Sequence, residues 1–164
     1  MIDAQLLKEL EYFEGNKSKV YWDTRGLPTI GVGHLLTQSE LSSGKIVIGG
    51  ELVRYADGLT DDQIQVLLNR DIKIAEDSIA RLVKVPLTQG QYDALCSWTF
   101  NVGSGALASS TLLKVLNACN YDQVPGQMLR WTHNHDGSIN QGLTRRREAE
   151  VQLWNGTDAN GCTH

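Results

Sequence analysis

The sequence predicts an α+β fold, with strands early in the chain and helices in most of the rest. Hydrophobic residues recur at helical spacing before Glu14 and again over residues 60–83. Runs of β-branched and aromatic residues flank glycine-containing turns between residues 19 and 55. From Gln89 onward every periodic segment is helical. A chain of 164 residues is long enough for one domain with a proper hydrophobic core.

The first predicted helix begins after Asp3, a candidate N-cap, and ends before Gly15. Glu14 is its last residue and lies four positions after Leu10, so its carboxyl falls on or beside the apolar face. The helix dipole is negative at this end. Both burial and the dipole favour the protonated form of a carboxyl there, which a general acid needs near neutral pH.

Two strands are predicted directly after this helix, over residues 19–23 and 27–34, separated by a glycine-containing turn. By the two-residue period of a strand, Thr29, Gly31 and Gly33 share one face of the second strand. This face carries one hydroxyl and then no side chains. A flat ligand is therefore expected to approach the backbone closely there.

Asp23 ends the first of these strands, so we expect it to stay solvated and ionised. With Glu14 it makes a pair of carboxyl groups in opposed environments beside an open strip, the pattern expected of a glycosidase. Each feature by itself has a simpler interpretation. Glu14 alone suits a paired structural carboxylate, Asp23 alone suits the start of a turn, and the two glycines suit a bulge.

The rest of the chain predicts a short helical turn over residues 35–44, a second hairpin over 45–55 and then helices. The hairpin either covers the first sheet or extends the wall of a groove, and we favour the first role. Thr60 caps the helix that ends near residue 83. Later helices are expected over residues 89–100, 111–118 and 122–132, and from a Thr144 cap through Trp154. The first of them should bury a stripe of Tyr92, Leu95, Cys96 and Thr99 or Phe100, and a break should follow it at Gly103-Ser104-Gly105. The second should be capped by Ser109 or Ser110.

Three blocks of the sequence resemble the phage-type lysozymes, glycoside hydrolase family 24. The first holds Glu14, Asp23 and Thr29, with eight and then five residues between them, and continues through TIGVGH. The others are LTQGQYDALCSWTFNVG, from residue 87 to 103, and GLTRRREAEVQLWNG, from residue 142 to 156. The resemblance implies one lysozyme-like catalytic domain over residues 1–164. Its small sheet-bearing lobe covers about 12–60, a linking helix about 60–83, and a helical lobe about 84–164 plus the N-terminal helix.

The resemblance implies an endolysin muramidase. Such an enzyme hydrolyses the β-1,4 bond between N-acetylmuramic acid and N-acetylglucosamine in bacterial peptidoglycan, for host lysis and phage release. Glu14 is expected to protonate the leaving oxygen. Asp23 is expected to stabilise positive charge at the anomeric carbon and to help place the attacking water, which Thr29 helps to hold, with inversion. No cofactor or metal is expected.

Further residues carry roles that the resemblance implies. Gly31, Gly33 and Asn101 are expected to line the sugar groove, with a helix-end cap as the alternative for Asn101. Thr132 is expected to do so too, although it stands where the family often has Asn. Two supporting residues complete this set: His34 is expected to be structural, and Arg145 either pairs with the catalytic glutamate or is an ordinary surface arginine.

The composition, with 41% hydrophobic and 21% charged residues, is typical of a soluble globular protein. The net charge of −4 argues against a nucleic-acid partner. We expect no signal peptide and no membrane insertion, because the N-terminal segment is acidic and no long apolar run occurs. A monomer is also expected. The resemblance then implies accumulation in the host cytoplasm, release through a holin, and action in the periplasm on the cell wall.

Some polar clusters have weaker interpretations. The three cysteines Cys96, Cys119 and Cys162 are an odd number, which favours reduced thiols, with one disulfide left open. The loop of His133, His135 and Asp136 has no standard metal-ligand spacing. Most of the run Arg145-Arg146-Arg147 is expected at the surface, because consecutive helical residues point in different directions.

Two other functions compete with hydrolysis. A wall-binding protein of the same fold would keep the groove and lose catalysis. A lytic transglycosylase would use one acid and an internal sugar hydroxyl, and would leave an anhydro end. The presence of Glu14, Asp23 and Thr29 together favours hydrolysis over both.

Overall fold

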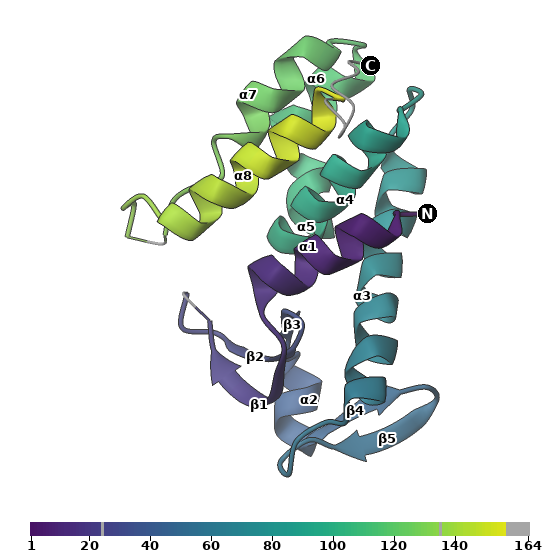
Figure 1. Ribbon diagram of the computed structural model, residues 1–164, viewed down its shortest axis with the longest axis vertical. Coiled ribbons are helices and arrows are strands. Elements are labelled where there is room, and N and C mark those ends of the chain that lie inside the picture. The colour runs from purple at the N-terminus through teal and green to yellow at the C-terminus, as the bar shows by residue number, and fades with distance from the viewer. Residues whose placement is uncertain (24, 135, 157–164) are drawn as a thin grey trace. The chain divides into compact units, whose positions relative to one another are not determined.

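A computed structural model of the chain describes residues 1–23, 25–134 and 136–156. The chain forms two compact units, one from Lys8–Lys73 and one from Met1–Leu7 together with Ile74 onward. Helices α1 (Ala4–Glu14) and α3 (Asp61–Leu82) contribute residues to both units (Figure 1). All named strands of the described residues lie between residues 17 and 54, which agrees with the predicted α+β class.

The unit of residues 8–73 contains a three-stranded antiparallel sheet in the order β1-β2-β3. Its strands are β1 (Lys17–Trp22), β2 (Pro28–Gly31) and β3 (His34–Leu35). Tyr21 lies opposite Thr29 in the register, so the two side chains share one face of the sheet.

The expectation of one continuous second strand over residues 27–34 is wrong. Val32 and Gly33 form a turn between β2 and β3. Gly31 and Gly33 have φ angles of 65° and 67°, which side-chain-bearing residues rarely adopt. Since the strand turns at these glycines, Thr29, Gly31 and Gly33 do not form a single flat face.

The second part of this unit matches the predicted helical turn and hairpin. These elements are α2 (Gln38–Ser43), β4 (Lys45–Ile48) and β5 (Glu51–Arg54). The Thr37 side chain caps α2 and the Glu40 side chain bonds back to the cap, a reciprocal capping box. The unit's buried apolar side chains come from all its parts: Leu10, Ile30, Val32, Leu36, Ile46, Ile48, Tyr55, Leu59, Ile64, Leu67, Leu68 and Ile72.

Thr60 caps α3, as predicted. Its hydroxyl accepts a hydrogen bond of 3.1 Å from the backbone N–H of Gln63, and the Gln63 side chain accepts one of 2.9 Å from the N–H of Thr60. None of the helices in the described ranges is both long enough and apolar enough to cross a lipid bilayer.

The other unit is helical, and α8 lies along α4 within it (Figure 1). Its elements are α4 (Gln89–Val102), α5 (Ser104–Ser109), α6 (Thr111–Asn117), a 3-10 turn η1 (Tyr121–Gln123), α7 (Val124–Met128) and α8 (Gln141–Trp154). The predicted stripe on α4 is too narrow, because every residue from 93 to 99 is buried. A helix enclosed by its neighbours has no polar face for a periodic pattern to reveal.

Helix ends differ from the predictions where a different residue caps them. Asn140 rather than Thr144 caps α8, since its side chain accepts a 3.0 Å hydrogen bond from the N–H of Leu143. Ser110 caps α6, one of the two predicted alternatives. The predicted helix over residues 122–132 is a 3-10 turn followed by α7, which ends at Met128. The predicted break is confined to Gly103, because α5 already begins at Ser104.

Cys96 and Cys119 are free thiols, the first buried and the second exposed. Burial raises the pKa of the Cys96 thiol to about 12, so this group is un-ionised at neutral pH. The third cysteine, Cys162, lies outside the described residues.

Candidate active site

Glu14 is the last residue of α1, and the chain leaves the helix at Gly15 as predicted. Gly15 has a φ angle of 76°, and its N–H bonds to the carbonyl of Glu11 at 2.9 Å. Asp3 accepts a hydrogen bond of 2.9 Å from the N–H of Leu6, so the predicted N-cap is also present. Glu14 itself is half-buried.

The Glu14 carboxyl packs directly on the backbone of Gly33. A Cβ atom added to Gly33 would lie 2.6 Å from the Glu14 Oε2 atom and 2.8 Å from its Cδ atom. Neither distance is tolerated between real atoms, so a side chain at position 33 would displace the Glu14 carboxyl. The close approach predicted at Gly33 therefore exists, but the group that approaches is the glutamate carboxyl.

Asp23 follows β1 and is half-buried, with donors on both carboxylate oxygens. Its Oδ1 accepts hydrogen bonds from the backbone N–H groups of Arg25 at 2.8 Å and Leu27 at 2.9 Å. Its Oδ2 pairs with the Arg25 guanidinium at 3.1 Å. An ionised carboxylate only accepts hydrogen bonds, which fits this set of donors. Arg25 was not among the residues predicted for the site.

Thr29 is buried in β2, and its hydroxyl donates a 3.0 Å hydrogen bond to the carbonyl of Leu27. The oxygen thereby keeps its acceptor capacity for another group. Gly31 lies in a different environment from Gly33. A Cβ atom there would contact Ile64 at 3.5 Å and Leu67 at 3.9 Å, so its open side faces the apolar core of the unit.

Tyr21 links these groups, and the sequence analysis missed it. Its hydroxyl donates a 3.1 Å hydrogen bond to the backbone carbonyl of Glu14. Burial raises the pKa of Tyr21, and the charges of Glu14 and Asp23 raise it further. Both carboxyl groups therefore lie within electrostatic range of one phenol. The signal in the sequence was the position of Tyr21 two residues before Asp23, on the strand that leads to it.

His34 is buried at the start of β3 between two carboxylates. Its Nδ1 lies 2.7 Å from Oδ2 of Asp71, and its Nε2 lies 2.9 Å from Oε1 of Glu40. Arg70 extends this cluster, with 3.7 Å between its Nε and Oδ1 of Asp71. Burial lowers the pKa of His34, but the hydrogen bonds and charges of Asp71 and Glu40 outweigh it, so the net pKa is raised. This geometry suits the structural role expected for His34.

The remaining predicted site residues lie in the helical unit. Asn101 is half-buried near the end of α4, and its Oδ1 accepts a 2.8 Å hydrogen bond from Arg147. Thr132 is buried, and its backbone carbonyl accepts from the N–H of Asn140 at 2.8 Å. Arg145 is exposed on α8.

The expectation that most of the arginine run lies at the surface is wrong. Arg146 and Arg147 are buried, and both pair with the buried carboxylate of Glu150. Arg146 also donates to the carbonyl of Ser97 at 3.0 Å. Burial raises the pKa of Glu150, and the two guanidinium groups oppose this effect. A buried arginine needs such partners, and they come from both α4 and α8.

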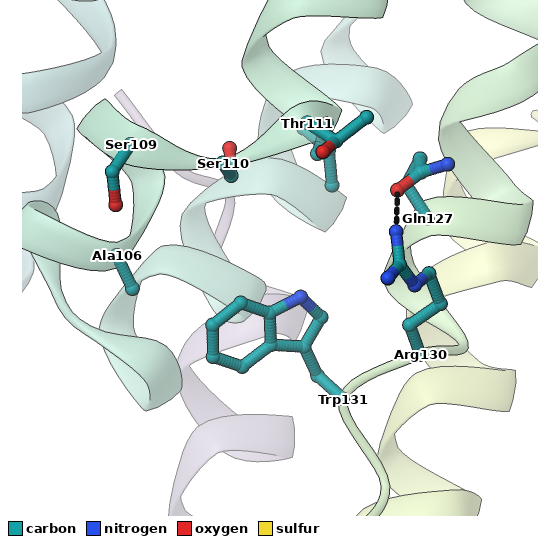
Figure 2. Close-up of a pocket in the computed structure, with 8 residues that line it drawn as sticks. Ala106, Ser109, Ser110, Thr111, Gln127, Arg130 and Trp131 are labelled. Carbon is teal, nitrogen blue, oxygen red and sulfur yellow. Dashed lines mark hydrogen bonds between the residues drawn. The ribbon is translucent and has the colours of Figure 1, made fainter.

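A hollow of about 410 Å³ opens on the helical unit beside Trp131. Figure 2 shows the indole of Trp131 below a row of small residues, with Arg130 and Gln127 at one side. The small residues are Ala106, Ser109, Ser110 and Thr111. The Trp131 ring is 40% exposed and stands edge-on to the buried ring of Trp98, with 5.5 Å between the ring centroids.

Within the described parts of the chain, no group of three or more His, Cys, Asp or Glu side chains is placed to hold a metal ion. His133 is exposed and forms an isolated bridge with Ile139. His135, which belonged to the loop considered for metal binding, lies outside the described residues.

The arrangement of Glu14, Asp23 and Thr29 around Tyr21 agrees with the proteins of known sequence and structure that the chain resembles. The sequence profile described as Phage lysozyme matches residues 11–150. This chain belongs to the phage lysozyme family. The endolysin of Salmonella phage P22 is 42% identical to this lysozyme over 130 residues, which cover 79% of this chain and 82% of that relative.

Solved structures agree with this membership. A crystal structure of a P22 lysozyme mutant has a TM-score of 0.71 and 37% identity, and covers 94% of this chain and 97% of that one. The muramidase domain of SpmX from Asticcacaulis excentricus has a TM-score of 0.74 and 27% identity, with coverages of 94% and 97%. The lysozyme-like fold expected from the sequence is confirmed.

Proposed function

We propose that this lysozyme cleaves the β-1,4 bond between N-acetylmuramic acid and N-acetylglucosamine by acid-assisted hydrolysis at Glu14, Asp23 and Thr29. As a phage lysozyme, the protein is an endolysin muramidase that acts on bacterial peptidoglycan in host lysis. One observation carries the assignment of residues: the charges of Glu14 and Asp23 both act on Tyr21, and Thr29 lies opposite Tyr21 in the sheet.

Glu14 donates its proton to the glycosidic oxygen as the bond breaks. Its carboxyl packs on the Gly33 backbone, and its backbone carbonyl accepts a hydrogen bond from the Tyr21 hydroxyl. Such support limits the positions that the carboxyl can take, which favours proton transfer along one direction.

Asp23 stabilises the positive charge that develops at the anomeric carbon. Its oxygens are held by Arg25 and by two backbone N–H groups, so the carboxylate keeps one orientation. Thr29 helps to hold the attacking water. Because the Thr29 hydroxyl donates its hydrogen bond to the carbonyl of Leu27, the Thr29 oxygen accepts a hydrogen bond from that water, which turns a lone pair of the water toward the sugar. The water attacks the anomeric carbon on the face opposite the leaving group and passes its proton to the Asp23 carboxylate, which gives inversion.

Gly31, Gly33, Asn101 and Thr132 are proposed to border the sugar groove, although the burial of Gly31 and Thr132 limits their part to the shape of the groove wall. Arg145 is exposed, and its proposed role is that of the family arginine which pairs with the catalytic glutamate. His34 is proposed to hold the sheet in place rather than to touch substrate.

The hollow beside Trp131 is proposed to contact the wall polymer. An exposed indole, a guanidinium and several hydroxyl groups together suit a ligand with apolar faces and acidic groups. Peptidoglycan offers both, in its sugar rings and in the carboxylates of its peptides. The change Trp131→Ala should weaken sedimentation with purified walls, and unchanged sedimentation would exclude this contact.

The protein is proposed to act as a monomer, to be made in the host cytoplasm and to reach the periplasm through a holin. Expression in host cells with and without a holin tests the route. Lysis that needs the holin supports it, and equal lysis in both cells contradicts it.

The proposed reaction is tested by loss of turbidity of purified peptidoglycan in the presence of a chelator. We expect wild type to clear the suspension and Glu14→Gln to be slower by about two orders of magnitude or more, the range of general acid catalysis. Hydrolysis adds one water to the product mass, whereas an anhydro product would identify a transglycosylase. If neither protein clears the suspension but both sediment with it, the protein is a wall-binding module.

A further inference from the structure

A fully buried arginine, Arg147, contacts the proposed substrate residue Asn101. Arg147 has no exposed surface, and its Nε lies 2.9 Å from Oε1 of Glu150, which is 1% exposed. From the other side of the same guanidinium, Nη2 donates a 2.8 Å hydrogen bond to Oδ1 of Asn101. The arginine therefore bridges a buried carboxylate and a half-buried amide.

This contact decides which way the Asn101 amide points. A guanidinium has only N–H donors, so the amide group that faces it must be the oxygen. The amide nitrogen then lies on the opposite branch of the side chain. Within residues 1–23, 25–134 and 136–156, no acceptor is hydrogen-bonded to that nitrogen. Asn101 thus presents an N–H donor and has its acceptor already occupied.

The surrounding charges hold Arg147 in this position. Glu150 also receives hydrogen bonds from Arg146 at 3.3 Å and from the Ser97 hydroxyl at 2.5 Å. Glu150 and Arg147 are three residues apart on α8, while Ser97 and Asn101 are four apart on α4, so the network joins facing sides of two helices. The planar fork of an arginine reaches both partners at once, which a lysine ammonium does not.

We propose that Arg147 is a positioning residue that turns the Asn101 carboxamide so that its nitrogen donates to an amide carbonyl oxygen of the peptidoglycan strand. This inference rests on the proposed function. Amide carbonyls occur in the acetamido group of each sugar and in the stem peptides, and both only accept hydrogen bonds. A de-N-acetylated sugar instead carries an ammonium group, which meets a donor at Asn101 and is disfavoured.

The test compares kcat and KM on soluble peptidoglycan strands for wild type, Asn101→Ala, Arg147→Lys and the double variant. We expect each single change to raise KM by about five- to tenfold, the effect of one neutral hydrogen bond, with kcat changed less than about twofold. The double variant should have the KM of Asn101→Ala, because the proposed effect of Arg147 on substrate binding passes through that amide. Strands stripped of peptides by an amidase then identify the source of the carbonyl: the effect persists for acetamido groups and disappears for stem peptides.

Asn117→Ala is the matched control, because Asn117 uses both ends of its amide within the protein. Its Oδ1 accepts from the N–H of Lys84 at 2.8 Å, and its Nδ2 donates to the carbonyl of Leu82 at 2.9 Å. This variant should lose thermal stability and keep its KM. A KM that stays at the wild-type value in Asn101→Ala, or an Arg147→Lys effect that adds to that of Asn101→Ala, overturns the inference.

Two further measurements keep the proposal testable if Arg147→Lys does not fold. Asn101→Asp keeps an acceptor for Arg147 and should lose affinity for acetylated strands but gain it for de-N-acetylated ones. In a Glu14→Gln background, the side-chain N–H resonances of Asn101 should shift when uncleaved strands are added, and unshifted resonances contradict the contact. If wild type fails to cleave peptidoglycan at all, the proposed function fails instead, which these binding measurements distinguish.

Discussion

The hydroxyl of Tyr21 donates a 3.1 Å hydrogen bond to the backbone carbonyl of Glu14, so strand β1 holds the last residue of α1. The helix carbonyls at this end have no partner within the helix, and the phenol supplies one. The same bond places the proposed acid beside β1, the strand that is followed directly by the proposed second carboxylate, Asp23.

Replacing Tyr21 by Phe should lower kcat strongly and reduce the free energy of unfolding only slightly. Loss of the hydrogen bond should reduce the free energy of unfolding by about 1 kcal/mol. The Glu14 backbone then moves relative to Asp23, and a misplacement of this kind should reduce kcat by about tenfold or more. Turnover and urea unfolding of the same preparation measure the two effects.

Tyr55→Phe is the matched control, because the Tyr55 hydroxyl also donates to a backbone glutamate carbonyl, that of Glu40, at 2.9 Å. It should lose similar stability and keep its kcat. Equal turnover in the two variants would mean that the Tyr21 bond contributes only to folding.

Gly33→Ala should abolish most of the activity. The added methyl group would lie 2.6 Å from Oε2 of Glu14, so the carboxyl must leave its position. We expect a fall in kcat of about a hundredfold or more, as for loss of a general acid.

Gly44→Ala separates this effect from backbone strain. Gly44 has a φ of 71°, close to that of Gly33, and nothing lies within 4 Å of an added methyl group. Both variants should lose about 1 kcal/mol of stability, and only the Gly33 variant should lose activity. Activity retained in Gly33→Ala would show that the Glu14 carboxyl can work from another position.

His34→Asn should destabilise the protein most at mildly acidic pH. The folded pKa of His34 is raised, so its stabilising effect is fully present below the unfolded pKa of about 6.5 and is lost as pH rises through the folded value. Burial raises the pKa of Glu40, but the Thr37 N–H and His34 outweigh it and the net pKa is lowered. The Glu40 contribution is therefore lost as pH falls below about 4.5 through its folded value.

Urea unfolding at pH 5.5 should then show a loss of about 2–4 kcal/mol for His34→Asn, and a smaller loss at pH 9. His133→Asn, which changes an exposed histidine, should show no such pH dependence. If His34→Asn lost the same free energy of unfolding at both pH values, a charged His34 would not be what stabilises the cluster.

Asp93→Asn should stabilise the protein at neutral pH. Burial raises the pKa of Asp93 to about 6, with the nearby carboxylate of Asp3 adding to the effect. A raised acid pKa means that the folded state binds the proton more tightly, so stability falls as pH rises from about 4 to about 6.

The amide of Asn at position 93 carries no charge and still accepts the 2.8 Å hydrogen bond from Gln89. The gain at pH 7 should be on the order of 1–2 kcal/mol, and it should vanish near pH 4. Thermal unfolding at the two pH values measures this difference. A variant that is less stable than wild type at pH 7 would show that the carboxylate has a favourable partner there.

Local patterns in the sequence predicted the structure correctly where it depends on residues that are neighbours along the chain. The Asp3 and Thr60 caps, the Gly15 helix end and the hairpin at residues 45–55 were all predicted correctly. Each depends on a backbone conformation or hydrogen bond within a few positions along the chain. The resemblance that identified the family depended likewise on spacing between residues that are close in sequence.

The patterns failed where distant segments meet. The local sequence does not indicate that Arg146 and Arg147 are buried, because Arg146 bonds to Ser97 and Arg147 bonds to Asn101, both on another helix. The glycine pair was read as an open strip, whereas Gly31 faces the core. In both cases the residue is surrounded by a helix or strand that lies far away in the sequence.

The sequence by itself determined the family, most of the elements and the three proposed catalytic residues. The tertiary structure decided the contacts of the site residues. Gly33 packs against the Glu14 carboxyl, Tyr21 donates to the Glu14 backbone carbonyl, and Arg147 donates to Asn101. The reason is physical. Periodicity and capping are set by bonds a few residues apart, whereas the contacts that orient a carboxyl or an amide form only when segments far apart in the chain pack together.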